Sequence, residues 1–179
     1  RLIFPIRNVS GTVIGFGGRL ISGEPGGAKY INSPETELYH KGRTLYGLYE
    51  SKNNIRHQRT MLLVEGYMDL ISLYQAGFDN VAASLGTALT YDQALLCRRF
   101  ADRVVFLYDG DSAGQKAMGR GAINLLAAGL DLRVCRLPEG KDPDDVIREQ
   151  GKEEMARLIE SSQDYFQYRT DEYRQSEEN

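Results

Sequence analysis

Between residues 61 and 151, short apolar runs alternate with segments in which apolar residues recur at helical spacing. The runs cover residues 61–64, 81–86, 104–108 and 132–138. Continuous apolar runs of this length are typical of strands that are buried on both faces, as in a parallel sheet. The alternation of strand and helix predicts a small parallel sheet with right-handed crossover connections.

Residues at the ends of the intervening segments support this assignment. Thr90 is suited to cap a helix that extends to about Ala101, and Ser112 is suited to cap the next helix. Gly77 is typical of a helix C-terminus, and Pro143 is typical of a first helical turn. A helix is therefore expected after each of the four strands.

The first part of the chain follows a different pattern. The runs 2–7 and 12–21 are strand-like and are separated by the turn sequence Asn8-Val9-Ser10-Gly11, which predicts an antiparallel hairpin. Residues 22–34 show no strong period and are expected to form a loop. At its end, Ser33-Pro34-Glu35 has the cap, the proline and the acid of a short helical turn.

The two patterns divide the chain into parts. Residues 50–59 have the composition of a polar helix or linker, so we expect residues 1–60 to form part of a basic N-terminal subdomain and residues 61–151 to form the α/β domain. Residues 152–179 keep a helical period at first and then become polar. This C-terminal helical segment is expected to dock through its aromatic residues, Tyr165, Phe166 and Tyr168.

Charge is distributed unevenly along the 179 residues. The net charge is −3, but residues 1–60 carry nine Lys and Arg against four Asp and Glu, and residues 61–179 carry thirteen against twenty-one. A basic front joined to an acidic back suits a protein that holds a polyanion with one part and metal ions with the other. Acids that merely interact with solvent on helix surfaces would also explain the second half.

The sequence argues against a membrane-spanning protein and against a secreted one. No apolar run approaches the ~20 residues of a membrane span, and no signal-peptide pattern is present. Cys97 and Cys135 lack metal-binding spacing, so no zinc site is expected. With 41% hydrophobic and 26% charged residues, the chain is expected to be a soluble cytoplasmic protein with no membrane partner.

Acidic residues follow three of the predicted strands. Glu65 comes after the first strand, Asp109 and Asp111 after the third, and Asp142 and Asp144 after the fourth. The carboxyl ends of parallel strands share one edge of a sheet, where ligands commonly bind. Because five clustered carboxylates would repel one another, the pattern predicts a site for a hard divalent cation such as Mg²⁺.

Other interpretations of Asp109-Gly110-Asp111 can be tested on the sequence. Taken alone, the tripeptide also fits a solvated turn. An EF-hand loop would need an acid or amide near Ala113 and a Glu near Arg120, and neither is present. A P-loop needs Gly-Lys-Ser/Thr, which the nearest candidate, Gly27-Ala28-Lys29, lacks.

The acidic motifs together resemble the Toprim module, which bacterial primases, topoisomerases and some nucleases share. They are Glu65-Gly66-Tyr67-Met68-Asp69, Asp109-Gly110-Asp111-x-Ala113-Gly114 and Asp142-Pro143-Asp144. Blocks in the front part are similar to the RNA polymerase core of a DnaG-type bacterial primase, and they cover residues 1–6, 15–19, 29–36 and 40–47. The resemblance extends from Arg1 to about Ile159.

This resemblance implies a fold and an activity. The fold is α/β, with a Toprim-type parallel sheet flanked by helices, preceded by a small, basic, β-rich subdomain and followed by C-terminal helices. The activity is DNA-templated synthesis of short RNA primers from ribonucleoside triphosphates on single-stranded DNA, at the replication fork in the bacterial nucleoid. The nascent RNA would be a further partner, and the replicative helicase would bind through a domain that is absent here.

The resemblance also implies roles for individual residues. About two ions of Mg²⁺ or Mn²⁺ would be held by carboxylates, those of Asp109, Asp111, Asp142 and Asp144. Glu65 would be a metal ligand or the general base at the attacking 3′-hydroxyl, and Asp69 a supporting acid. Nucleotide phosphates and the nucleic-acid backbone would be handled by polar and basic residues of the front part, namely Arg19, Lys29, Tyr30, Asn32 and Lys41.

Other members of the Toprim group remain alternatives. A nuclease or a topoisomerase fragment would share the acidic motifs, but it would not need the blocks at residues 29–32 and 40–43. A non-catalytic interaction module would not need to keep all five acids. The zinc-binding module and the helicase-binding domain of primases are absent from this sequence, so we expect the chain alone to synthesise primers weakly or not at all.

Overall fold

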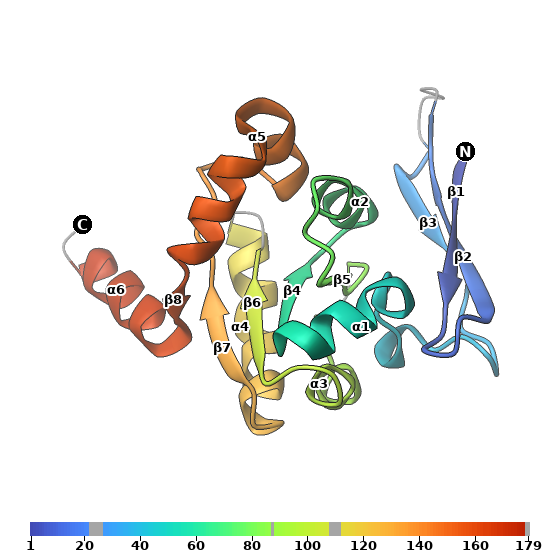
Figure 1. Cartoon of the computed structure of the whole chain (residues 1–179), viewed down its shortest axis with the longest axis horizontal. Helices are drawn as coiled ribbons and strands as arrows, with labels where there is room; N and C mark the ends of the chain where they lie inside the picture. Colours follow the sequence, from blue (N-terminus) through green and yellow to red (C-terminus); the bar gives the residue numbers. More distant parts are fainter. Residues whose placement is uncertain (22–26, 87, 108–111, 178–179) are drawn as a thin grey trace.

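The computed structural model describes residues 1–21, 27–86, 88–107 and 112–177, with the backbone alone for residues 112–117 and 175–177. In the described residues, the strands form a three-stranded sheet of order β1-β2-β3 and a five-stranded sheet of order β5-β4-β6-β7-β8. Figure 1 shows the three-stranded sheet standing beside the helix-covered larger sheet. We call the smaller one the front sheet.

The front sheet is antiparallel. It consists of β1 (Leu2–Arg7), β2 (Val13–Arg19) and β3 (Tyr30–Asn32), with Leu2 opposite Arg19. The side chain of Asn8 closes the β1–β2 turn by accepting hydrogen bonds from the backbone N–H groups of Ser10 and Thr12. The predicted hairpin is confirmed.

Two expectations for residues 22–34 and their end are wrong. Residues 30–32 form β3 instead of loop, because pairing with β2 supplies hydrogen bonds that no local pattern reveals. The helical turn expected at Ser33-Pro34-Glu35 does not form. The Ser33 hydroxyl accepts from the backbone N–H of Phe16 at 3.0 Å, and Ser33 N donates to Phe16 O at 2.8 Å, so this serine extends the sheet contact instead of capping a helix.

The larger sheet contains the four predicted parallel strands. They are β4 (Thr60–Val64), β5 (Val81–Ala83), β6 (Arg103–Phe106) and β7 (Asp131–Val134). The neighbours β5, β4, β6 and β7 pair in parallel. The short strand β8 (Gln163–Asp164) adds an antiparallel edge that the sequence pattern did not predict.

Helices follow the strands as expected. They are α1 (Leu48–Gln58), α2 (Tyr67–Gln75), α3 (Tyr91–Arg98), α4 (Ser112–Ala127), α5 (Pro143–Glu160) and α6 (Tyr165–Glu177), with a 3₁₀ turn η1 (Lys41–Arg43) before α1. Thr90 caps α3 by accepting from Gln93 N, although α3 ends three residues before Ala101. Gly151, the last residue of the expected α/β domain, interrupts α5 with a φ of 84°.

The larger sheet is buried on both faces, which explains the continuous apolar runs. Along β4, Leu63 points into the core layer formed with α1, α3, α4 and α6, whereas Leu62 and Val64 point into the layer formed with α2 and α5. Tyr168 of α6 is buried, but Phe166 is 63% exposed, so the expected docking through Phe166 is wrong. Helical period places Phe166 on the outer side of α6.

Candidate active-site pocket

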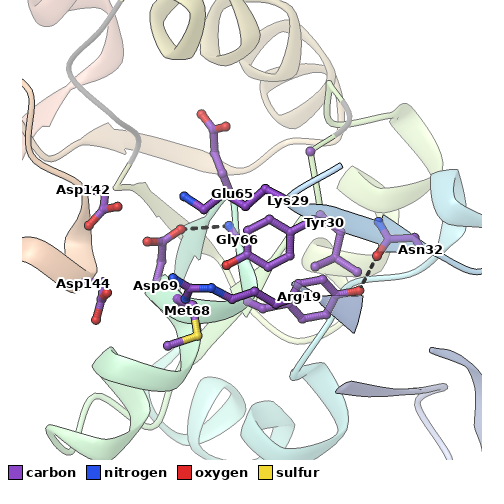
Figure 2. Close-up of a pocket in the computed structure, with 13 residues that line it drawn as sticks. Arg19, Lys29, Tyr30, Asn32, Glu65, Gly66, Met68, Asp69, Asp142 and Asp144 are labelled. Carbon is purple, nitrogen blue, oxygen red and sulfur yellow. Dashed lines mark hydrogen bonds between the residues drawn. The ribbon is translucent and has the colours of Figure 1, made fainter. Parts of the chain in front are cut away.

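A pocket of about 300 Å³ lies between the front sheet and the carboxyl end of β4. Residues from the front sheet, from the β4–α2 connection and from the start of α5 line it together (Figure 2). The lining residues are Arg19, Lys29, Tyr30, Asn32, Glu65, Gly66, Tyr67, Met68, Asp69, Leu85, Gly86, Asp142 and Asp144. One wall is therefore basic and polar, and the other is acidic.

The acidic wall is held by hydrogen bonds at the starts of two helices. Asp69, in the first turn of α2, accepts from Gly66 N at 2.9 Å, which closes a capping box. Asp142 is the N-cap of α5 and accepts from Asp145 N at 2.7 Å. Asp144 accepts from the Ser72 hydroxyl, which ties α5 to α2. These carboxylates lie where helix dipoles favour negative charge.

Glu65 follows β4 directly and contributes its side chain to the same wall. Its Oε1 atom is shielded from solvent. The backbone carbonyl of Glu65 accepts from Leu85 N at 2.9 Å, which fixes the β4 end against the segment after β5. Leu85 has a φ of 60°, an uncommon conformation for a residue with a side chain, so this segment is constrained beside the pocket.

The basic wall comes from the ends of β2 and β3. The Arg19 guanidinium lies 5.7 Å from the centroid of the Tyr30 ring, and the Lys29 ammonium lies 6.0 Å from the same centroid. Burial raises the pKa of Tyr30 above its ordinary value, and the positive charge of Arg19 opposes this shift. Tyr30 therefore stays a neutral phenol flanked by two cations.

Tyr67 joins the two walls. Its hydroxyl donates to Asn32 Oδ1 at 2.7 Å, and its ring stacks on Phe4 with a centroid distance of 4.5 Å. Gly17 of β2 makes room for it, since a Cβ there would lie 2.1 Å from the Tyr67 hydroxyl oxygen. Tyr67 belongs to the motif Glu65-Gly66-Tyr67-Met68-Asp69, which by itself predicts no role for this side chain. A glycine within a strand-like run, such as Gly17, is the kind of sequence signal that indicates a close approach.

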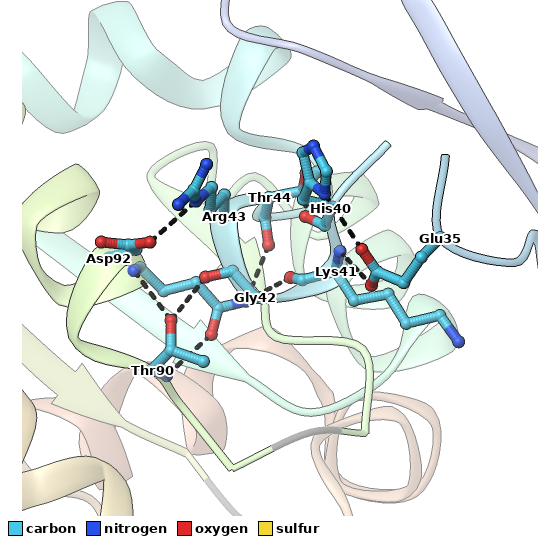
Figure 3. A network of polar contacts seen from close by, with 9 residues as sticks. Glu35, His40, Lys41, Gly42, Arg43, Thr44, Thr90 and Asp92 are labelled. Carbon is cyan, nitrogen blue, oxygen red and sulfur yellow. Dashed lines mark hydrogen bonds and ion pairs between the residues drawn. The ribbon is translucent and has the colours of Figure 1, made fainter. Parts of the chain in front are cut away.

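Lys41 lies in η1, apart from the residues that line the pocket in the described part of the chain. A polar network fastens this turn to α3 (Figure 3). The amide of Gln93, which is fully buried, donates to Lys41 O at 3.0 Å and to Thr44 O at 2.8 Å, and accepts from Thr90 N. The backbone N–H of Lys41 donates to Glu35 and lowers the pKa of that carboxyl.

The structure thus brings together most of the predicted site residues. Glu65, Asp142 and Asp144 share one pocket with the predicted basic and polar residues Arg19, Lys29, Tyr30 and Asn32. Asp109 and Asp111 lie outside the described residues. Among those described, no three His, Cys, Asp or Glu side chains are grouped closely enough to hold a metal ion by themselves. The donors are nevertheless carboxylate oxygens, which suit Mg²⁺ or Mn²⁺.

The described helices include none that is both long and apolar enough to cross a bilayer.

Comparison with known proteins gives two family matches that together span most of the chain. Residues 62–147 match the Toprim-like family, and residues 1–52 match the N-terminal domain of the DNA primase catalytic core. A DNA primase from Clostridium acetobutylicum is 51% identical over 170 residues, which are 94% of this chain. The chain belongs to the bacterial DnaG-type primase family.

Solved primase structures have the same fold. The zinc-binding and RNA polymerase domains of the Aquifex aeolicus primase match 94% of this chain with a TM-score of 0.89 and 50% identity. A DnaG primase catalytic domain bound to single-stranded DNA matches 90% of it with a TM-score of 0.83 and 43% identity. The expected α/β fold with a Toprim-type sheet is confirmed.

The chain spans between about a quarter and a half of the length of the primase chains that it matches. It covers 28% of the Clostridium acetobutylicum protein, 41% of the Aquifex aeolicus structure and 53% of the structure bound to single-stranded DNA. It corresponds to a fragment of the primase catalytic core.

Proposed function

We propose that this chain carries the nucleotidyl-transfer site of a primase, which synthesises short RNA primers from ribonucleoside triphosphates on a single-stranded DNA template. The observation that carries the proposal is the meeting of an acidic wall and a basic wall across one pocket. When two nucleotides are joined, the 3′-hydroxyl oxygen attacks a phosphorus atom. Negative charge then increases on the phosphate oxygens and must be stabilised. The two walls supply complementary charge for this purpose.

The basic wall is proposed to bind the phosphates of the incoming nucleotide. Arg19 offers a fork of N–H donors that matches phosphate oxygens, and Lys29 adds a point charge. The Tyr30 phenol, neutral and held between the two cations, is suited to donate a further hydrogen bond or to stack on a base. Asn32 is oriented for the same purpose by the hydroxyl of Tyr67.

The acidic wall is proposed to hold divalent cations. Asp142 and Asp144, together with Asp109 and Asp111, would be the ligands, and Glu65 would be a further ligand or the base that accepts the proton of the 3′-hydroxyl. Mg²⁺ or Mn²⁺ bound there would stabilise charge on the attacking and leaving oxygens of the displacement. The hydrogen bonds to Asp142 and Asp69 keep the acidic wall from rearranging as charge develops.

Further assignments belong to this proposal. Lys41, on the turn clamped by Gln93, is proposed to contact the nucleic-acid backbone. Residues 1–60, 61–151 and 152–179 are proposed as the basic part, the Toprim domain and the C-terminal helical segment. The nascent RNA is the expected product partner. The replicative helicase would bind another part of the longer protein, at the replication fork in the bacterial nucleoid.

The experiment that tests this function replaces Asp142 by Asn in a primase that contains this chain. Asn is as good an N-cap as Asp, so α5 keeps its start while the charge is lost. We expect incorporation of labelled ribonucleotides on single-stranded DNA to fall by about 100-fold or more, since loss of a charge stabiliser typically has an effect of this size. Asp109→Asn is expected to act similarly.

Asp171→Asn, on α6, removes the same charge away from the pocket and is expected to leave incorporation unchanged. Calorimetric titration of Mn²⁺ into the parent and Asp142→Asn proteins provides a second measurement. Full incorporation and unchanged Mn²⁺ affinity in Asp142→Asn would refute the proposed site.

A further inference from the structure

Basic residues of the first part of the chain gather on a second face, away from the pocket. Residues 1–60 contain nine Lys and Arg, and two of them, Arg19 and Lys29, line the pocket. Four others lie with the arginine that directly follows α3 on a surface that we call the α1–α3 face. Its cations are Arg7, Arg43, Lys52, Arg56 and Arg99.

Contacts between these residues show that the α1–α3 face is continuous. A hollow of about 170 Å³ is lined by three of the arginines around an apolar floor, which consists of Val9, Leu45, Leu48 and Leu96. The Lys52 ammonium donates to Val9 O at the rim of this hollow. Arg56 and Arg99 lie over the same ring, that of Phe100, at 4.7 Å and 5.7 Å from its centroid.

The positive charge of this face is only partly compensated. Its five cations are accompanied by two ion-paired acids, Glu50 at 3.5 Å from Arg7 and Asp92 at 2.8 Å from Arg43. The Arg43 side chain is 69% exposed in spite of its ion pair. An arginine has five N–H donors and a lysine has three, so each retains donors for an anion.

The strand register separates this face from the pocket. Arg7 is opposite Val13, and Arg19 is opposite Leu2, so the two arginines lie at opposite ends of the hairpin. Arg19 lies six residue steps along β2 from Val13, a distance of about 20 Å at ~3.3 Å per step. A stacked nucleic-acid strand advances ~3.4 Å per nucleotide, so about six nucleotides would bridge the two places.

We propose that the α1–α3 face is a second binding surface for single-stranded DNA, which holds the backbone of the strand outside the pocket. This inference rests on the proposed function, since it requires a strand at the pocket. Cations around an apolar floor, with the exposed ring of Tyr49 under Lys52, suit phosphates and unstacked bases without sequence preference. This surface would increase the number of nucleotides of single-stranded DNA that the protein binds. It would not change the nucleotidyl-transfer step in the pocket.

The first test compares Arg56→Gln/Arg99→Gln with a matched control, Arg157→Gln/Arg169→Gln, which removes two exposed arginines from α5 and α6. Fluorescence anisotropy gives the affinity for single strands of about 5 and about 20 nucleotides, one shorter and one longer than the about six nucleotides that would bridge the two places. We expect the affinity of the face variant for the longer strand to fall by about 10-fold. The slope of log affinity against log salt should decrease by about 1.4, or about 0.7 for each lost phosphate contact.

Binding of the short strand and binding by the control protein should stay at the parent values. A second pair, Arg43→Gln/Lys52→Gln, should reproduce the loss, and it keeps the test valid if replacement of Arg56 loosens the packing on Phe100. Parent affinity and parent slope in both pairs would overturn the second surface. A larger loss for duplex than for single-stranded DNA would overturn the single-strand assignment.

Lys29→Gln, in the pocket, separates the two proposals. If this variant loses affinity for both lengths while the face variants do not, the proposed function stands and the second surface fails. If the parent binds neither strand, both proposals fail.

Discussion

The larger sheet and the front sheet contribute opposite walls of the pocket, and they are stabilised in different ways. The larger sheet is covered on both faces, and Leu63, Val64 and Phe106 in its centre are fully buried. The front sheet buries one face only. Ile3, Phe16 and Ile31 on its other face are 54%, 51% and 48% exposed. The acidic residues are therefore attached to a sheet that is buried on both faces. The basic wall belongs to a sheet that is buried on one face only.

Tyr67 contacts both regions. It starts α2, yet its ring packs against Phe4 of β1 and against Tyr46, at centroid distances of 4.5 Å and 4.6 Å. Tyr67 therefore contributes to the distance between the two walls. Substitutions near Tyr67 should shift the basic wall, and substitutions in the larger sheet should destabilise the whole chain.

The largest difference between the regions is expected for core truncations. Leu63→Ala removes a fully buried side chain from β4 and should lower the free energy of unfolding by roughly 2–5 kcal/mol. Ile31→Ala, on the exposed face of the front sheet, should change it by less than about 0.5 kcal/mol. Urea denaturation measures both. Equal effects of the two substitutions would show that the front sheet is covered in solution.

A smaller effect is expected where the regions touch. Gly17→Ala places a methyl group against the Tyr67 ring and should lower the free energy of unfolding by about 1–3 kcal/mol. It should also reduce nucleotide incorporation by primase that contains this chain, because β2 carries Arg19. The neighbouring Gly18→Ala is the matched control, since its Cβ would meet other atoms only at 3.4 Å or beyond.

A double-mutant cycle completes this test. In a Tyr67→Leu background the ring is absent, so Gly17→Ala should cost much less than it does in the parent protein. Additive losses in urea denaturation would contradict the assignment of Tyr67 as the obstacle.

The smallest effect for a single group concerns pH, and it involves only the larger sheet, which has both cysteines in its core layers. Burial raises the pKa of the Cys97 and Cys135 thiols from 9.0 to about 12. The folded protein keeps them protonated, whereas the unfolded chain releases the protons above pH 9. The free energy of unfolding is therefore unaffected below that pH and decreases above it, by about 1.4 kcal/mol for each thiol at about pH 10.

Urea denaturation at about pH 8 and pH 10 of the parent and of Cys97→Ala/Cys135→Ala isolates this contribution. The parent should lose more stability between the two pH values than the variant does. The same loss in both proteins would show that the thiols do not titrate on unfolding.

The predictability of individual elements followed the range of the interactions that form them. The β1–β2 hairpin and the cap of α3 by Thr90 depend on neighbours in sequence, and both were predicted. Strand β3 and the sheet contact of Ser33 depend on residues of β2, and neither was predicted. The site shows the same division. Glu65, Asp142 and Asp144 were expected together because parallel strands end at one edge.

By itself, the sequence determined the α/β order, the acids at strand ends and the family, because apolar period, turn residues and motifs are local features. The tertiary structure alone decided how the walls meet. Tyr67 reaches Asn32 across 35 residues, and Gln93 reaches Lys41 across 52. Such contacts depend on close packing between separate elements, and a Cβ at Gly17 would clash with the Tyr67 side chain. Packing of this kind produces no periodic pattern in the sequence.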